Sequence, residues 1–330
     1  MSAVSLWRLA PESYEPHTLH RTERAWGESN CYIDLWVEVI HALGRESFAC
    51  LPFTLAVDFE GDQWTFAKPP LGDLFELYGV VVEELSVWKP LLVHCEEQLR
   101  LGRLVVTEAD AFDLPDTAGT DYRRSHGKTT IAVEQVDVAA GQLGYFHNGG
   151  YHVLDGADFR GLFRLDTDVP SALPLYAEIA KFNCLTDPSP ETLRAGSLAL
   201  LAKHLGRRPA TNPIRRFGVR LQTDLAWLMA QELPTFHAYA FVTVRQLGAS
   251  YELASLYLRW LTPQMRPALR QPLSSASEDF LAISNSAKTL ILKLARVAGT
   301  RRSADFSPLL EEMAARWDSA MGTLVTRLAA

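Results

Sequence analysis

Residues 29–44 read SNCYIDLWVEVIHALG and decide how the first half of the chain folds. The large apolar side chains stand at positions 32, 35, 36, 39, 40 and 43, which is the spacing of one buried helix face. Asn30 is a residue type that caps helix N-termini, and Gly44 is one that ends helices. The pattern therefore predicts a helix that begins at Cys31 and buries one side.

Cys31 is the position at which covalent chemistry is most plausible. In the first turn of a helix the backbone N–H groups lack intrahelical partners and the dipole is positive, so both favour a thiolate. The thiolate is the nucleophilic form of cysteine. The alternative is a small buried core residue, which is what we expect of Cys50 and Cys95. Cys184 is expected to be structural too.

The composition is that of an ordinary globular protein. The chain has 330 residues, of which 48% are hydrophobic and 22% charged, and its formal net charge of −7 argues against a general binder of nucleic acid or anionic membranes. Its four cysteines show no C-x-x-C pair or disulfide framework. Because we find no signal-peptide pattern and no apolar run long enough to cross a bilayer, we expect a cytoplasmic protein.

The two halves of the chain follow different patterns. Up to residue 168, two helical segments are expected at 71–78 and 88–101, and short strands at 51–57, 64–66, 80–87, 104–106, 129–133, 143–146 and 151–154. Beyond it, helices are expected at 172–182, 189–205, 213–231, 235–247, 249–261, 275–298 and 306–327, with breaks that include Gly248 and Pro272. We therefore expect an α+β domain at 1–168 and an all-α helical bundle at 169–330.

A cysteine nucleophile needs a base, and His126 is the candidate among nine histidines. It stands where a polar loop enters the apolar strand predicted at 129–133, so its ring is expected at the rim of a sheet. A loop cap is the alternative role. His17 with His20, and His147 with His152, invite a metal interpretation, but their spacings are not those of a zinc motif, so no metal is expected.

The order of these features resembles the papain-like cysteine fold: a cysteine at a helix start, then helices and strands, then a histidine before a strand and a hairpin. The positions LVV at 104–106, Asp110, Leu114-Pro115, His126 and IAV at 131–133 resemble more narrowly the butirosin-biosynthesis protein H N-terminal domain family. That family is related to bacteriocin-processing cysteine peptidases. The chain also resembles a bacterial family of unknown function.

The resemblance implies an acyltransferase that moves an amino-acyl group from a carrier-protein thioester to an amine. Cys31 matches the nucleophile and His126 the general base. The third, orienting residue is open between Asn148 and Asp155, which both follow His126 at the ends of predicted strands.

Papain-like proteases carry a glutamine ahead of the cysteine, and residues 23–30 contain none. The oxyanion would then be met by the backbone N–H of Cys31 together with Asn30 or Ser29. The missing glutamine favours transfer from an activated thioester over peptide cleavage.

The expected mechanism is ping-pong, through an acyl group on Cys31 and with His126 as proton shuttle. The donor would be a phosphopantetheine thioester on a partner carrier protein, the acceptor a small amine, and Arg123 or Arg124 would meet the pantetheine phosphate. No cofactor bound by the chain itself is expected. Two alternatives remain: a cysteine hydrolase of a thioester or amide, and a catalytically silent module that binds a carrier protein.

Overall fold

The computed structural model describes residues 3–21, 23–166 and 174–328, and its contacts group the chain into two units. The first, here called the α/β unit, comprises Met1–Thr22, Cys31–Ser47 and Leu71–Pro188. The second, the helical unit, comprises Glu23–Asn30, Phe48–Pro70 and Ser189–Ala330. The boundary predicted at 168/169 falls among residues outside the described part of the chain. The chain passes from the α/β unit to the helical unit after Pro188, and two earlier segments also belong to the helical unit.

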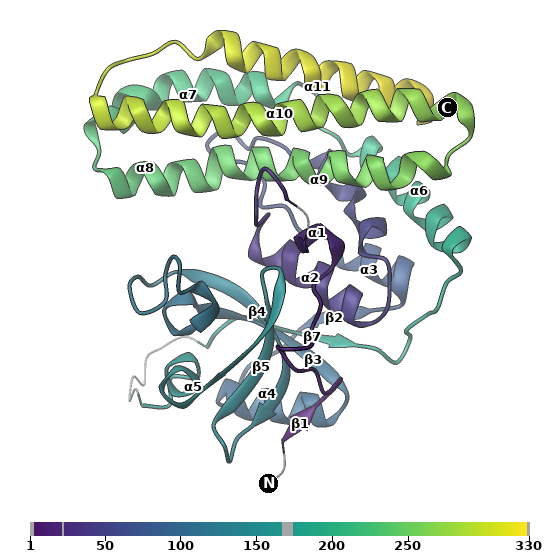
Figure 1. Cartoon of the computed structure of the whole chain (residues 1–330), viewed down its shortest axis with the longest axis vertical. Coiled ribbons are helices and arrows are strands. Elements are labelled where there is room, and N and C mark those ends of the chain that lie inside the picture. The colour runs from purple at the N-terminus through teal and green to yellow at the C-terminus, as the bar shows by residue number, and fades with distance from the viewer. Residues whose placement is uncertain (1–2, 22, 167–173, 329–330) are drawn as a thin grey trace. The chain divides into compact units, whose positions relative to one another are not determined.

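One antiparallel sheet forms the centre of the α/β unit (Figure 1). Its strands are β1 (Val4–Ser5), β2 (Val81–Glu84), β3 (Arg103–Asp110), β4 (Lys128–Asp137), β5 (Gln142–His147), β6 (Gly150–Asp155) and β7 (Ala177–Lys181). They lie in the order β2-β7-β3-β4-β5-β6, with β1 beside β4. The prediction of mixed helix and sheet in the first half of the chain is confirmed.

Strand β7 corrects the helix predicted at 172–182, of which residues 172 and 173 lie outside the described part. It pairs with β2 on one side and with β3 on the other. Residues 177–180 are buried. Because pairing on both sides is a tertiary effect, it overrides the helical pattern of this short segment.

Helices cover both faces of the sheet. The helices of the α/β unit are α1 (Thr18–Arg21), α2 (Cys31–Ala42), α3 (Leu71–Tyr78), α4 (Leu91–Arg100) and α5 (Gly156–Leu162). Tyr32 of α2 donates a hydrogen bond to Glu178 of β7 at 2.7 Å, whereas Ile179 belongs to the core that contains Cys95 of α4. Since successive strand side chains point to opposite faces, α2 and α4 lie on opposite sides of the sheet.

Helix α2 begins at Cys31 as predicted. Gly44, with φ of +72°, follows its end and donates to the carbonyl of His41, which is the left-handed ending that glycine allows. Burial goes further than the one face expected from the sequence. Asp34 and Glu38 are 0% exposed, and the apolar residues between them are at most 1% exposed. The helix therefore carries two carboxylates into the interior.

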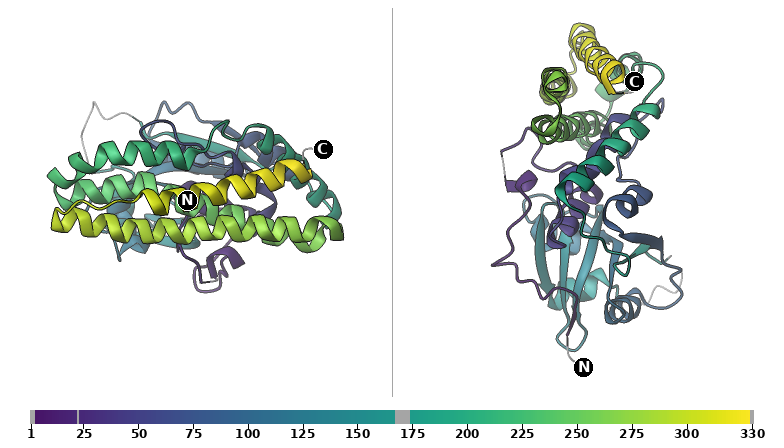
Figure 2. Two further views of the ribbon diagram at one scale, coloured as in Figure 1. Left: turned by 90° about the horizontal axis from the view of Figure 1, so that it is seen from above. Right: turned by 90° about the vertical axis from the view of Figure 1, so that its right-hand side faces the viewer.

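Most helices of the helical unit run alongside one another, whereas α6 (Pro190–Gly206) runs obliquely to them (Figure 2). The helices of this unit are α6, α7 (Pro213–Ala230), α8 (Leu233–Ala240), α9 (Gln246–Leu261), α10 (Pro267–Thr300) and α11 (Ser307–Leu328), with short segments η4 (Phe241–Arg245) and η5 (Thr262–Gln264). The prediction of a helical second half is confirmed. In residues 3–21, 23–166 and 174–328, no helix has the length and apolar character needed to cross a membrane.

Two predicted helix breaks are wrong. Pro272 lies in the second turn of α10, where it removes a single intrahelical hydrogen bond, so the helix continues. Gly248 lies inside α9 against the indole of Trp26, and a Cβ there would come within 2.3 Å of the ring. Gly248 is therefore explained by the close approach of Trp26 and not by a turn.

Residues 51–57 and 64–66 do not form the predicted strands. Residues 47–56 form the 3₁₀ segment η1 (Ser47–Ala56), which contains Pro52, a residue without an N–H for a strand ladder. Only an isolated antiparallel bridge, between Phe59 and Trp64, occurs in this region. Residues 48–70 belong to the helical unit.

A buried charge pair joins residues 23–30 to the helical unit. Arg24 Nη2 lies 3.1 Å from Glu252 Oε2, and both side chains are 3% exposed. The Glu252 carboxylate also accepts the backbone N–H groups of Ala25 and Trp26, and the Trp26 indole donates to Ser284 at 2.9 Å. These contacts explain why a segment so early in the sequence folds with the C-terminal helices.

Candidate functional site

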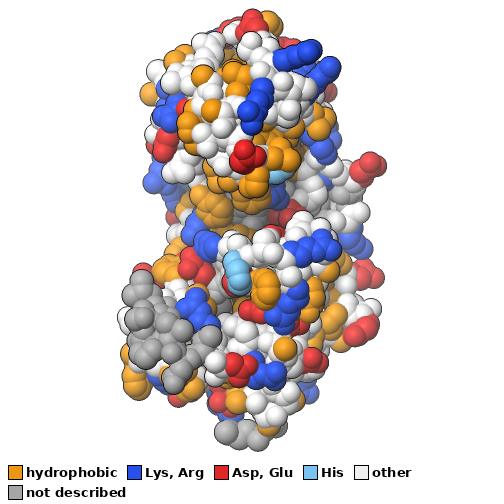
Figure 3. Space-filling view, turned by 90° about the vertical axis from the view of Figure 1, so that its left-hand side faces the viewer, with side chains coloured by type: hydrophobic (Ala, Val, Ile, Leu, Met, Phe, Trp, Pro, Cys, Tyr) orange, Lys and Arg blue, Asp and Glu red, His pale blue; other side chains and the backbone are white. Residues whose placement is uncertain are grey.

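A cavity of about 1000 Å³ lies in the α/β unit beside the ends of β3 and α5. Its walls come from residues 87–91 before and at the start of α4, Asp110, Phe112 and Asp113, His126, residues 160–164 and 166, and residues 174–175. On the face drawn in Figure 3, basic side chains border hydrophobic side chains and an exposed histidine. The volume is at the upper end of the range for small-molecule sites.

His126 is held at this cavity from two directions. Its Nδ1 lies 2.6 Å from Asp110 Oδ2, and its ring stacks on Phe112 with centroids 4.5 Å apart. The side chain is nevertheless 76% exposed. No protein group among the described residues hydrogen-bonds Nε2, so that nitrogen faces outward from an otherwise fixed ring.

Asp110 is in turn fixed by the backbone. Its Oδ1 accepts the N–H groups of Phe112 and Gly127, each at 3.1 Å. Partial burial would raise the pKa of Asp110, but hydrogen bonds from His126 and the two N–H groups outweigh it and hold that pKa below the ordinary 3.8. The carboxylate therefore stays ionised and fixes the orientation of the His126 ring. Such a pair can accept a proton from a bound molecule at Nε2.

The sequence contains a signal for Asp110 that our prediction of site residues did not use. β3 and β4 pair antiparallel with Asp110 opposite Lys128. An aspartate at the end of one strand thus comes within reach of a histidine two residues before the next. Neither Asn148 nor Asp155, the two residues predicted to orient His126, holds the position that Asp110 occupies at the end of β3. Asn148 is in the β5–β6 turn with φ of +47°, and Asp155 ends β6 opposite Gln142.

Cys31 is half-buried at the first position of α2, and its thiol is free. It is not among the residues that line the cavity beside His126. The structure therefore places the predicted nucleophile and base in one unit, but it records no contact between them.

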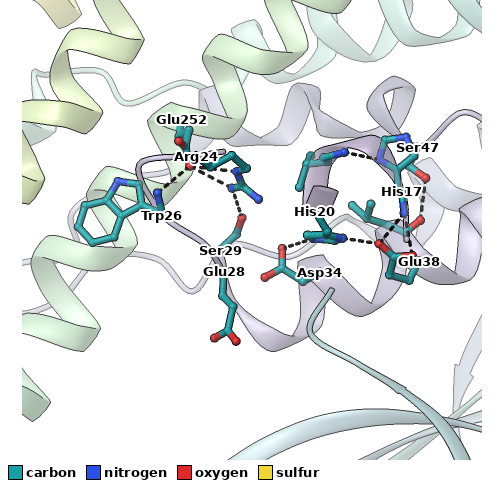
Figure 4. Close-up of polar contacts among 12 residues, drawn as sticks. His17, His20, Arg24, Trp26, Glu28, Ser29, Asp34, Glu38, Ser47 and Glu252 are labelled. Atoms are coloured by element: carbon teal, nitrogen blue, oxygen red, sulfur yellow. Dashed lines mark hydrogen bonds and ion pairs between the residues drawn. The ribbon is translucent and has the colours of Figure 1, made fainter. Parts of the chain in front are cut away.

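The predicted oxyanion groups have other partners. Ser29 accepts a hydrogen bond from Arg24 at 2.8 Å, as Figure 4 shows, and the side-chain amide of Asn30 donates to the carbonyl of Ala67 at 2.9 Å. All of these residues belong to the helical unit. Their side chains are therefore engaged in holding that unit together.

Of the two arginines predicted to bind the pantetheine phosphate, Arg123 already has carboxylate partners. Arg123 forms ion pairs with Asp113 and Asp158 and lies over the Phe112 ring, 5.2 Å from its centroid. Arg124 is exposed, two residues before His126. Arg124 is therefore the better placed of the two for an anion from solution.

A second histidine, His20, is buried between two carboxylates of α2 (Figure 4). Its Nδ1 bonds to Glu38, and its Nε2 lies 3.2 Å from Asp34 Oδ1. Burial alone would lower the pKa of His20, but the two carboxylates outweigh it and raise the pKa from 6.5 to about 9. His20 is therefore an imidazolium at neutral pH. With both ring nitrogens occupied, it has no site for a substrate proton.

Glu38 gathers further donors. It accepts the backbone N–H of His17 at 3.1 Å and the hydroxyl of Tyr14 at 2.5 Å. Burial would raise its pKa, but His20 and these donors keep the pKa of Glu38 below its ordinary value. The cluster of Tyr14, His17, His20, Asp34 and Glu38 thus ties the N-terminal segment to α2. Sequence reasoning missed it, although two carboxylates one turn apart on a largely apolar helix were a signal.

A third histidine, His147, is 2% exposed and has both ring nitrogens bonded. Nδ1 lies 2.5 Å from Asp116, and Nε2 lies 2.7 Å from the Thr129 hydroxyl. Like His20, His147 is a buried residue whose hydrogen bonds connect parts of the fold. Among the described residues, no group of three or more His, Cys, Asp or Glu side chains is arranged to hold a metal ion.

The comparisons with known proteins give a family and no activity. The family model described as DUF1839 N-terminal domain matches residues 15–182, and the one described as DUF1839 C-terminal domain matches residues 190–326. The chain belongs to the DUF1839 family. No curated protein matches it. The gap between the two matches spans Pro188 and Ser189, between which the chain passes from the α/β unit to the helical unit.

Proposed function

We propose that this chain is an acyltransferase that moves an acyl group from a thioester to an amine, with His126 as its general base. The observation that carries the proposal is the His126 ring, fixed through Nδ1 by Asp110 and open at Nε2 beside a large cavity. The thioester and the amine come from the resemblance to the butirosin-biosynthesis protein H family. A papain-like core for the α/β unit is part of the same proposal, supported by a cysteine-led helix lying on an antiparallel sheet.

The chemistry needs one proton carrier. The amine nitrogen attacks the thioester carbonyl carbon while His126 Nε2 accepts the amine proton. The carbon–sulfur bond then breaks, and the departing thiolate takes that proton back from the imidazolium. The products are an amide and a free thiol. Asp110 stabilises the transient imidazolium and keeps its ring in place, as a carboxylate does for a catalytic histidine.

A second candidate is the ping-pong route through Cys31, favoured by its free, half-buried thiol at the start of α2. In this route the acyl group would pass from a phosphopantetheine thioester on a carrier protein to Cys31, and then to the amine. It requires His126 and Cys31 to come together when substrate binds. The two routes differ in one observable, a covalent acyl group on Cys31.

The test uses the full chain with octanoyl and glycyl thioesters of pantetheine, with and without benzylamine. Amide formation is followed by chromatography with mass detection, and intact-protein mass reports any acyl adduct. We expect amide formation that falls about 10²–10⁴-fold in His126→Asn. Cys184→Ala, which removes an exposed free cysteine, is the matched control for Cys31→Ala.

Each outcome selects one interpretation. An adduct that Cys31→Ala abolishes and Cys184→Ala retains supports the ping-pong route, and amide formation without an adduct supports direct transfer. Thioester loss without amide indicates the hydrolase alternative. The absence of both turnover and adduct with every donor would contradict an enzymatic role and would favour the silent carrier-binding module.

A further inference from the structure

The charged side chains around the cavity already have partners. Lys89 pairs with Glu97, Arg160 Nε lies 3.1 Å from Asp166, and Asp113 lies 3.0 Å from Arg123. Asp110 is engaged by His126. An ammonium group entering this cavity would have to compete with an existing ion pair for a carboxylate.

Apart from His126 and Arg164, the remaining lining is apolar and aromatic. Leu91, Leu162, Phe163 and Phe112 contribute side chains, and Trp88 is 80% exposed, more than is usual for an indole. Trp88 is fixed in this exposed position, since its backbone N–H donates to His94 Nε2 at 3.3 Å and its ring meets His94 edge-on at 6.2 Å. A ligand that covers this indole removes apolar surface from water.

We infer that the cavity binds the hydrocarbon part of an acyl group, and that the donor is the thioester of an aliphatic or aromatic carboxylic acid without an α-ammonium group. This inference rests on the proposed function and changes its substrate class from the amino-acyl group expected from the resemblance. Trp88 is then the specificity-determining residue. The acyl chain lies along Trp88, Leu91 and Phe163, with its carbonyl end near His126.

Binding of free acids tests the inference without requiring turnover. Octanoate and 2-aminooctanoate form a matched pair that differs only by an α-amino group, and calorimetric titration of the full chain measures both. We expect octanoate to bind at least about tenfold more tightly than 2-aminooctanoate. Equal or tighter binding of 2-aminooctanoate would overturn the inference.

Variants of Trp88 locate the binding. Trp88→Ala is expected to weaken octanoate about tenfold or more, and Trp88→Phe to weaken it less, because the phenyl ring keeps part of the apolar surface. Trp227→Ala removes a 52% exposed tryptophan from the helical unit and should leave octanoate binding unchanged. Octanoate binding that is insensitive to Trp88→Ala would place the ligand elsewhere and contradict the inference.

The two proposals fail in different ways. Octanoate binding that depends on Trp88, together with no thioester turnover, would retain the acyl pocket and reject the acyltransferase. Turnover of the glycyl but not the octanoyl thioester would retain the acyltransferase and reject the apolar pocket.

Discussion

His126 and His20 lie in the same unit and each contacts a carboxylate, yet their surroundings differ in two respects. His20 has a side chain 4% exposed and a carboxylate on each ring nitrogen, whereas His126 is 76% exposed with a carboxylate on Nδ1 alone. A buried, doubly bonded imidazolium holds two parts of the fold together. A singly bonded, open imidazole is available to a ligand. The two histidines therefore differ in exposure and in the number of occupied ring nitrogens, and not in the presence of a carboxylate. These two properties distinguish a histidine that stabilises the fold from one that a ligand can reach.

The largest effect should come from removing a carboxylate from the buried cluster. Glu38→Ala leaves the His20 imidazolium short of one partner and also removes the acceptor of His17 N–H and Tyr14 hydroxyl. We expect a loss of about 3–5 kcal/mol in the free energy of unfolding, measured by urea denaturation of the full chain. Glu12→Ala, at an exposed position of the same unit, should change it by less than about 0.5 kcal/mol. Similar losses in both variants would show that the cluster is not a special source of stability.

The pH dependence of stability should separate the same two histidines. Because the pKa of His20 is about 9 in the folded protein and about 6.5 when unfolded, its contribution is complete below pH 6.5 and is lost as pH rises through 9. We expect a decrease of about 2–3 kcal/mol between pH 6.5 and 9.5, measured from denaturant midpoints at each pH.

His20→Gln should be less stable at neutral pH and should lack this decrease, whereas His126→Asn should retain it. Tyr14, which contacts Glu38 in the same cluster, titrates above this window, since its pKa is raised well above the ordinary value of 10, first by burial and then by Glu38. A decrease that persists undiminished in His20→Gln would assign it to another group.

Local periodicity predicted the elements that local interactions determine. Helix α2 and its Gly44 ending were readable, because the apolar spacing and the left-handed glycine are properties of consecutive residues. Strand β7 was not, since its pairing with β2 and β3 involves segments far away in the sequence. For the same reason, the sequence did not predict that residues 23–30 belong to the helical unit. Their residue Arg24 contacts Glu252, which lies 228 positions later in the sequence.

The candidate site was readable in part. His126 could be named because a polar loop meets an apolar strand there. Its partner Asp110 depends on the register between β3 and β4, which requires the sheet. The sequence predicted burial of one side of α2 only, and it does not reveal that the side carrying Asp34 and Glu38 is buried as well.

Among the variants of the histidine–carboxylate pairs, the smallest change in stability, and the sharpest contrast with Glu38→Ala, should come from the exposed pair of His126 and Asp110. His126→Asn removes an open side chain whose main contacts are one hydrogen bond and one ring stack, so we expect the free energy of unfolding to change by less than about 1 kcal/mol. Asp110→Asn should behave alike in stability, because an amide oxygen can still accept the Phe112 and Gly127 N–H groups. Both variants are nevertheless expected to lower amide formation strongly, with Asp110→Asn acting through the orientation and charge of the imidazole. Measuring unfolding and turnover on the same preparations checks this separation. A large loss of stability in either variant would show that His126, like His20, is a structural residue, and this would contradict its role as the candidate base.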